Sequence, residues 1–160
     1  MKKLLSVLIV IIFIALAVGA YYYIKQPVVK VAVLCKSIDS NGKPVDEFKG
    51  KVSSQKTEGK FGKSIRAKTI TYVVLSKDTT IYTSVKVLAR YTKNMKIIWY
   101  KGDPSSSGRI KVDNNVPVKS SYASSKLTIP QGLKEGKYSV NIYQQDSDIS
   151  EKTLNFEVKK

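Results

Sequence analysis

The sequence contains no histidine and a single cysteine, Cys35. Imidazole is the commonest general base and the commonest metal ligand in proteins, so its absence removes Ser-His and Cys-His nucleophile pairs. A Ser-Lys dyad needs no histidine, but the serines and lysines here form no recognisable nucleophile signature. We therefore predict that the chain is not an enzyme and has no catalytic residue.

Carboxylates are the remaining groups that could bind a ligand. Asp103, Asp113, Asp146 and Asp148 could bind calcium, although the spacing of Asp146 and Asp148 around a serine is more typical of a turn. No glycine-rich loop resembles a phosphate site. The sequence predicts no metal and no cofactor.

Aromatic residues suggest a binding surface. Trp99 and Tyr100 are adjacent on an expected strand, so one side chain points inward and the other outward. We predict that Trp99 lies in the core and that Tyr100 is exposed. Tyr82 also falls on the outward face of its strand, and with Tyr100 it could form a platform for a sugar or a partner protein. The alternative is that these are scattered surface aromatics.

The charge is strongly positive, with 28 Lys and Arg against 12 Asp and Glu and a net charge of +16. A positive electrostatic field of this kind attracts phospholipid headgroups, wall polymers or nucleic acid. Of these three partners we expect nucleic acid the least. The chain between Lys43 and Lys68 is rich in Lys and Gly and has little apolar periodicity. It predicts a long basic loop that could contain one short strand around Phe48 to Val52. The loop would be either a polyanion contact or a solvated connection. The candidate contact residues are Lys49, Lys51, Lys56, Lys60, Lys63, Arg66 and Lys68.

The stretch from Leu4 to Ile24 has no charged side chain. As a helix it would be roughly 30 Å long, which is enough to cross a bilayer. We predict a single-pass membrane anchor over residues 1–24, a short linker over 25–27 and an extracytoplasmic domain over 28–160. The alternative is a signal peptide cleaved after Ala20, which would release a secreted protein.

Residues 28–160 predict an all-β sandwich, because short alternating runs are separated by turn residues. In the first run, Val29, Val31, Val33 and Cys35 fall on one face, and Cys35 is expected to be buried. The basic loop occupies about 37–68. The later strands are expected at 69–76, 80–91, 96–101, 109–118, 125–129, 137–143 and 152–158.

The pattern over about 81–158 resembles an immunoglobulin-like or fibronectin type III-like sandwich. Val85, Val87 and Ala89, followed by Trp99, resemble the second and third strands of such domains. Leu133, Gly136 and Tyr138 resemble their tyrosine corner, where the tyrosine hydroxyl bonds back to the backbone. The resemblance implies structural roles for Trp99 and Tyr138, and a hydrogen bond from Tyr138 to the bend at Pro130 to Lys134.

These features lead to two hypotheses about function. The first is a noncatalytic binding or structural module, anchored in the cell membrane, that contacts a protein or a glycan. The second is an electrostatic tether that binds anionic polymer, lipid headgroups or nucleic acid through the Lys-rich stretch from Lys43 to Lys68.

Overall fold

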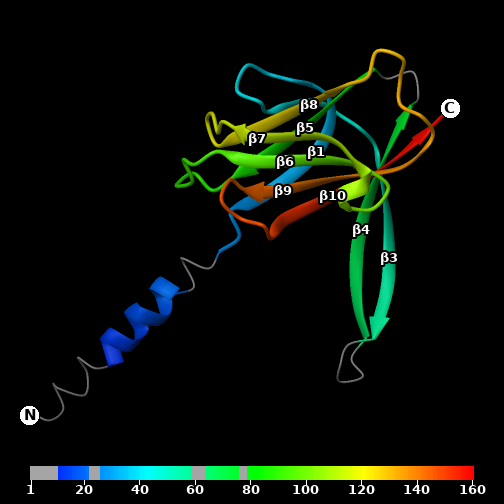
Figure 1. The fold of residues 1–160 in the computed structure, drawn as a ribbon. Helices are drawn as coiled ribbons and strands as arrows, with labels where there is room; N and C mark the ends of the chain where they lie inside the picture. The colour runs from blue at the N-terminus through cyan, green and yellow to red at the C-terminus, as the bar shows by residue number, and fades with distance from the viewer. Residues whose placement is uncertain (1–10, 22–25, 59–63, 76–78) are drawn as a thin grey trace, which may run out of the picture.

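The computed structural model describes residues 11–21, 26–58, 64–75 and 79–160, with the backbone alone for 52–58, 64–69 and 106. The chain forms two β-sheets (Figure 1). The strands are β1 (Val29–Ile38), β2 (Pro44–Glu47), β3 (Gly50–Glu58), β4 (Ser64–Leu75), β5 (Thr80–Val87), β6 (Met95–Lys101), β7 (Arg109–Val116), β8 (Tyr122–Thr128), β9 (Gly136–Gln144) and β10 (Ser150–Lys159), with a 3₁₀ turn, η1 (Ser106–Gly108), before β7.

The four-stranded sheet has the order β2-β1-β5-β8, and the six-stranded sheet has the order β3-β4-β10-β9-β6-β7. Their pairings are antiparallel except that β4 runs parallel to β10. Alternate residues of both sheets meet in one core, where Ile81 and Val85 from the four-stranded sheet pack with Ile97 and Val140 from the six-stranded sheet. The predicted all-β, two-sheet architecture is confirmed.

Trp99 lies at the centre of this core and is fully buried, as predicted. Its ring meets Phe156 edge-on at a centroid distance of 6.2 Å, and Phe156 stacks on Tyr138 at 5.1 Å. The indole Nε1 donates a hydrogen bond of 2.7 Å to Ser125 Oγ on the opposite sheet. The Tyr138 hydroxyl donates to the Lys134 carbonyl at 2.7 Å, which confirms the predicted bond to the bend.

The first strand differs from its predicted alternation. Its register with β5 shifts between Val29 and Val31, so Val29 is in the core while Val31 is 48% exposed. A shift of one residue moves the following side chains to the other face. Cys35 is buried as predicted. Ala89, which falls within the strand predicted at 80–91, is exposed because β5 ends at Val87.

The predicted basic loop is wrong over most of its length. The chain there forms β2, β3 and β4, and β3 pairs with β4 from Gly50 opposite Tyr72 to Glu58 opposite Ser64. Only residues 71–75 of β4 also pair with β10, so the rest of the hairpin leaves the sandwich as a two-stranded ribbon (Figure 1). Hydrophobic alternation marks a strand only when one face is buried, and this ribbon leaves the core.

Residues 11–21 form a helix that precedes the sandwich. Within the described part of the chain, no helix has the length and apolar character needed to cross a membrane. The predicted transmembrane helix is therefore not seen. Residues 4–10 and 22–24 of the proposed anchor lie outside the described residues.

Candidate functional site

The two tyrosines predicted to form one platform lie on different sheets. Tyr82 is on β5 and points away from the core on the outer face of the four-stranded sheet. Tyr100 is on β6, and because Trp99 points inward, Tyr100 lies on the outer face of the six-stranded sheet. Tyr100 is only 4% exposed, so the prediction that it is exposed is wrong. The structure does not bring these two residues together.

Neighbouring side chains cover Tyr100. Its hydroxyl lies beside the Tyr143 hydroxyl and the Arg109 guanidinium, and burial raises the pKa of the Tyr100 phenol. Tyr143 adds to this rise in pKa, while Arg109 opposes it. The tyrosines of this face are thus engaged by residues of their own sheet.

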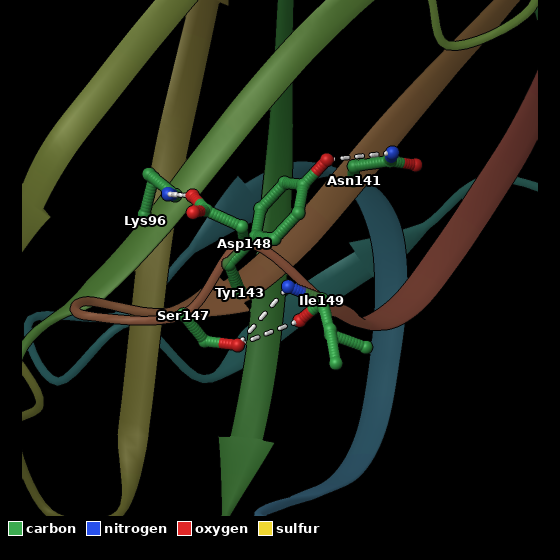
Figure 2. Close-up of polar contacts among 6 residues, drawn as sticks. All are labelled: Lys96, Asn141, Tyr143, Ser147, Asp148 and Ile149. Carbon is green, nitrogen blue, oxygen red and sulfur yellow. Dashed lines mark hydrogen bonds and ion pairs between the residues drawn. The ribbon is translucent and has the colours of Figure 1, made fainter.

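Tyr143 itself is held from several sides (Figure 2). Its hydroxyl accepts a hydrogen bond of 2.9 Å from Asn141 Nδ2, and Lys96 Nζ lies 5.0 Å from its ring centroid. Asn141 Oδ1 in turn accepts a bond of 2.8 Å from the Thr153 hydroxyl. The polar groups of Tyr143 and Asn141 are therefore bonded within the sheet, and we assign these two residues a structural role.

The outer face of the four-stranded sheet carries a different arrangement. Tyr82 on β5 is opposite Lys126 on β8, and Lys86 on β5 is opposite Tyr122 on β8. Lys126 Nζ lies 5.9 Å from the Tyr82 centroid, and Lys86 Nζ lies 5.8 Å from the Tyr122 centroid. Both rings are half-buried and both lysines are exposed. We call these four residues the lysine–tyrosine ladder.

The turn between β1 and β2 lies over the middle of the ladder. Ser84 Oγ donates a hydrogen bond of 2.6 Å to the Gly42 carbonyl. Gly42 has a φ of 84°, and a Cβ there would lie 3.1 Å from Ser124 Oγ, so only glycine fits without strain.

Beside this turn is a cavity of about 290 Å³. Its lining includes Val31, Val33, Lys43, Glu47, Lys86 and Tyr122.

A larger cavity of about 590 Å³ lies on the outer face of the six-stranded sheet, at the base of the hairpin. Lys51 and Lys137 line it together with Asp103 and Glu157. The two positive charges are matched by two negative ones, so this cavity has no clear preference for an anion.

The predicted polyanion residues are concentrated on one element, the β3–β4 hairpin. Lys49 and Lys51 are exposed at its base. Lys56 is directly opposite Arg66 in the register, and Lys68 is two positions along β4, so strand alternation puts these three positions on one side of the ribbon. Lys60 and Lys63 lie outside the described residues.

Sequence reasoning found Tyr82 but missed Lys86, Tyr122 and Lys126. The signal that could have found them is a spacing shared by two strands, because Tyr82 precedes Lys86 by four positions and Tyr122 precedes Lys126 by four. When two such strands pair antiparallel in this register, each tyrosine lies opposite a lysine.

Three of the four carboxylates that could have bound calcium are paired with lysines, and the fourth, Asp103, is exposed after β6. Asp146 lies 3.7 Å from Lys93, Asp148 lies 3.4 Å from Lys96, and Asp113 lies 2.8 Å from Lys111. Among the described residues, no three Cys, Asp or Glu side chains gather into a possible metal site.

The sequence matches no protein-family model and no curated protein. One solved structure with some similarity is a β-glucosidase from Listeria innocua in complex with gluconolactone, with 8% sequence identity and a TM-score of 0.33. The similarity covers 74% of this chain and 17% of that chain, so this chain spans about a sixth of the enzyme's length. A likeness this distant carries no argument about function.

Proposed function

We propose that this chain is a membrane-anchored, noncatalytic, immunoglobulin-like module on the extracytoplasmic face of the cell membrane, and that it binds an anionic glycan. The immunoglobulin-like assignment is supported by how the strands are divided. β1, β5 and β8 share one sheet while β6, β9 and β10 share the other, as strands A, B and E face strands C, F and G in such domains. In this assignment, β2, β3 and β4 are an insertion after the first strand.

The observation that carries the binding proposal is the lysine–tyrosine ladder. Tyrosine rings offer flat faces for sugar rings, and lysine ammonium groups bind phosphate or carboxylate groups. The two alternate on neighbouring strands, so a chain of charged sugars could contact both kinds of group in turn. The net charge of +16 adds a long-range attraction for such a polymer.

The anchor is supported by the uncharged run from Leu4 to Ile24. A helix of that length and composition inserts favourably into a bilayer. The domain would then be held close to the membrane surface, where an anionic wall polymer or glycan is within reach.

A second candidate is an electrostatic tether through the β3–β4 hairpin. The register favours it, because Lys56 and Arg66 occupy directly opposed positions. Like charges placed opposite one another are destabilising unless an anion neutralises them. The tether would bind at a different site from the ladder, and its affinity would fall more steeply with salt concentration.

The test is binding of the full chain, reconstituted in nanodiscs, to poly(glycerol phosphate), with neutral dextran as the uncharged comparison. The double variant Tyr82→Ala/Tyr122→Ala and the double variant Lys86→Gln/Lys126→Gln should each weaken binding about 5- to 30-fold, since each removes two contacts of roughly 0.5 to 1 kcal/mol. The double variant Lys101→Gln/Lys134→Gln is the charge-matched control, because both lysines are exposed and lie outside the ladder.

A third variant separates the two candidates. Lys56→Gln/Arg66→Gln/Lys68→Gln should change the affinity little if the ladder is the site. If this hairpin variant loses binding while both ladder variants keep it, the ladder proposal is wrong and the tether is supported.

A further inference from the structure

The loop between β9 and β10 lies at the end of the sandwich where the N-terminal segment joins it (Figure 1). The Val28 amide donates a hydrogen bond of 3.1 Å to Glu151 Oε2 at the start of β10. The Leu88 amide donates one of 3.0 Å to the Val28 carbonyl. The loop residue Ile149 is therefore only two positions from the side chain that holds the first residue of the domain.

Ile149 is 81% exposed, more than any other large apolar side chain among the described residues. The loop holds it outward instead of folding it onto the sheet (Figure 2). The Ser147 hydroxyl accepts a hydrogen bond of 3.1 Å from the Ile149 amide and donates one of 3.2 Å to the Ile149 carbonyl. An isoleucine fixed in water forgoes the stabilisation that burial would give.

Other bonds make the loop a rigid support. The Gln145 amide donates to the Asn94 carbonyl at 3.2 Å, and Gln145 Nε2 donates to Asn115 Oδ1 at 2.7 Å. The Ser147 amide donates to the Gln144 carbonyl at 3.1 Å. The position of Ile149 is thus set by the neighbouring strands and loops.

The charges of the loop are balanced within the protein. Asp148 pairs with Lys96, as Figure 2 shows, and Asp146 pairs with Lys93. Unpaired carboxylates would be repelled by anionic lipid headgroups, and these pairings reduce that repulsion. Lys30, next to Val29 at this end, is exposed and adds positive charge.

We propose that Ile149 inserts into the headgroup region of the bilayer and docks this end of the sandwich on the membrane. The inference rests on the proposed membrane anchor. Val28 is four positions after Ile24. A fully extended chain covers at most about 3.6 Å per position, so Val28 lies within roughly 14 Å of the end of the anchor. At that distance a loop beside Val28 reaches the lipid headgroups, and the apolar tip gains by leaving water.

The experiment places a nitroxide spin label on the full chain in nanodiscs made of equal parts phosphatidylcholine and phosphatidylglycerol. Ile149→Cys carries the label at the loop, and Gln131→Cys carries it in the exposed bend after β8, at the opposite end of the sandwich. Cys35 is buried and its pKa is raised to about 12, so the native thiol should stay unlabelled. The accessibility of each label to oxygen, which enters lipid, is compared with its accessibility to a water-soluble nickel chelate.

We expect the ratio of oxygen to nickel accessibility to be severalfold higher at 149 than at 131. Equal ratios at the two positions would overturn the docking proposal. Lipid is the only partner present, so a high ratio at 149 cannot come from a protein contact.

A third label at Ile12→Cys separates failure of the docking from failure of the anchor. If position 12 reports lipid while position 149 reports water, the anchor stands and the docking is wrong. If the label at position 12 also reports water, the membrane-anchor proposal is wrong, and the docking proposal that rests on it is wrong too.

Discussion

The outer faces of the two sheets use tyrosine in opposite ways. On the six-stranded sheet, Tyr100 is buried beside Tyr143 and Arg109, and the Tyr143 hydroxyl is bonded to Asn141. On the four-stranded sheet, Tyr82 and Tyr122 are half-buried and meet the ammonium groups of exposed lysines. On the first face Tyr100 is covered by its neighbours and the partly exposed Tyr143 is bonded through its hydroxyl, whereas the second face leaves two rings and two exposed lysines open to a partner.

This difference shows that an outward position on a strand does not by itself make an aromatic residue a binding residue. Tyr82 and Tyr100 both occupy outward positions, yet only Tyr82 remains half-exposed. What separates them is the side chains on the neighbouring strands, because Arg109 on β7 and Tyr143 on β9 cover Tyr100. If the comparison is right, substitutions on the closed side should change stability, and substitutions in the ladder should change binding.

The largest effect is expected from Trp99→Ala, which tests the core beneath both faces. The change should lower the free energy of unfolding by roughly 3 to 5 kcal/mol, because it leaves a cavity and removes the partner of Ser125. Chemical denaturation measures the loss. Binding of poly(glycerol phosphate) per folded molecule should be unchanged, and a parallel loss of binding would mean that the ladder depends on the core more directly than proposed.

Tyr138→Phe should have the next largest effect. It removes the bond to the Lys134 carbonyl while keeping the ring stacked on Phe156. The expected cost is about 1 to 3 kcal/mol, because the part-buried bond to the Lys134 carbonyl is lost and the carbonyl is left without its donor. A variant with unchanged melting temperature but lost binding would place Tyr138 on a functional surface and contradict its structural role.

The parts of the fold that the sequence predicts are those where one strand face is buried. On β6, inward Ile97 and Trp99 alternate with residues on the outer face. The same period of two on β9 predicts the inward positions of Tyr138, Val140 and Ile142. The tyrosine corner adds a local motif that does not depend on the other sheet.

The parts that could not be predicted depend on the pairing between strands. The burial of Tyr100 requires Arg109 and Tyr143, which come from the two neighbouring strands of the sheet. The ladder requires the register that puts Tyr82 opposite Lys126. The β3–β4 ribbon leaves the core, so no apolar period identifies it. The residue pattern of one strand, taken alone, predicts none of these three features.

A smaller effect is expected from Tyr100→Phe, which tests the closed face directly. The variant loses the interactions of the hydroxyl with Tyr143 and Arg109, at a cost of about 0.5 to 1.5 kcal/mol. Tyr82→Phe is the matched control and should change the free energy of unfolding by less than about 0.5 kcal/mol, because its ring is half-exposed. Equal costs for the two variants, measured by urea denaturation, would contradict the distinction between the faces.

The smallest effect concerns Cys35, which is buried on the same side of the sheet as Tyr82, directly opposite it in the register, and donates a hydrogen bond of 3.7 Å from Sγ to the Tyr82 carbonyl. Burial, helped by Glu47 and Asp46, raises the pKa of the thiol from 9.0 to about 12. The unfolded chain therefore ionises first, so this contribution to stability is complete below pH 9 and is lost as the pH rises toward 12. At pH 9.5 the loss is about 1 kcal/mol, and Cys35→Ala should not show it. The measurement is the difference in free energy of unfolding between pH 7.5 and pH 9.5 in the two proteins, since the other titrating groups contribute equally to both. If the two proteins lose the same amount, the thiol ionises in the folded state as readily as in the unfolded chain, and Cys35 is not shielded from water beside Tyr82.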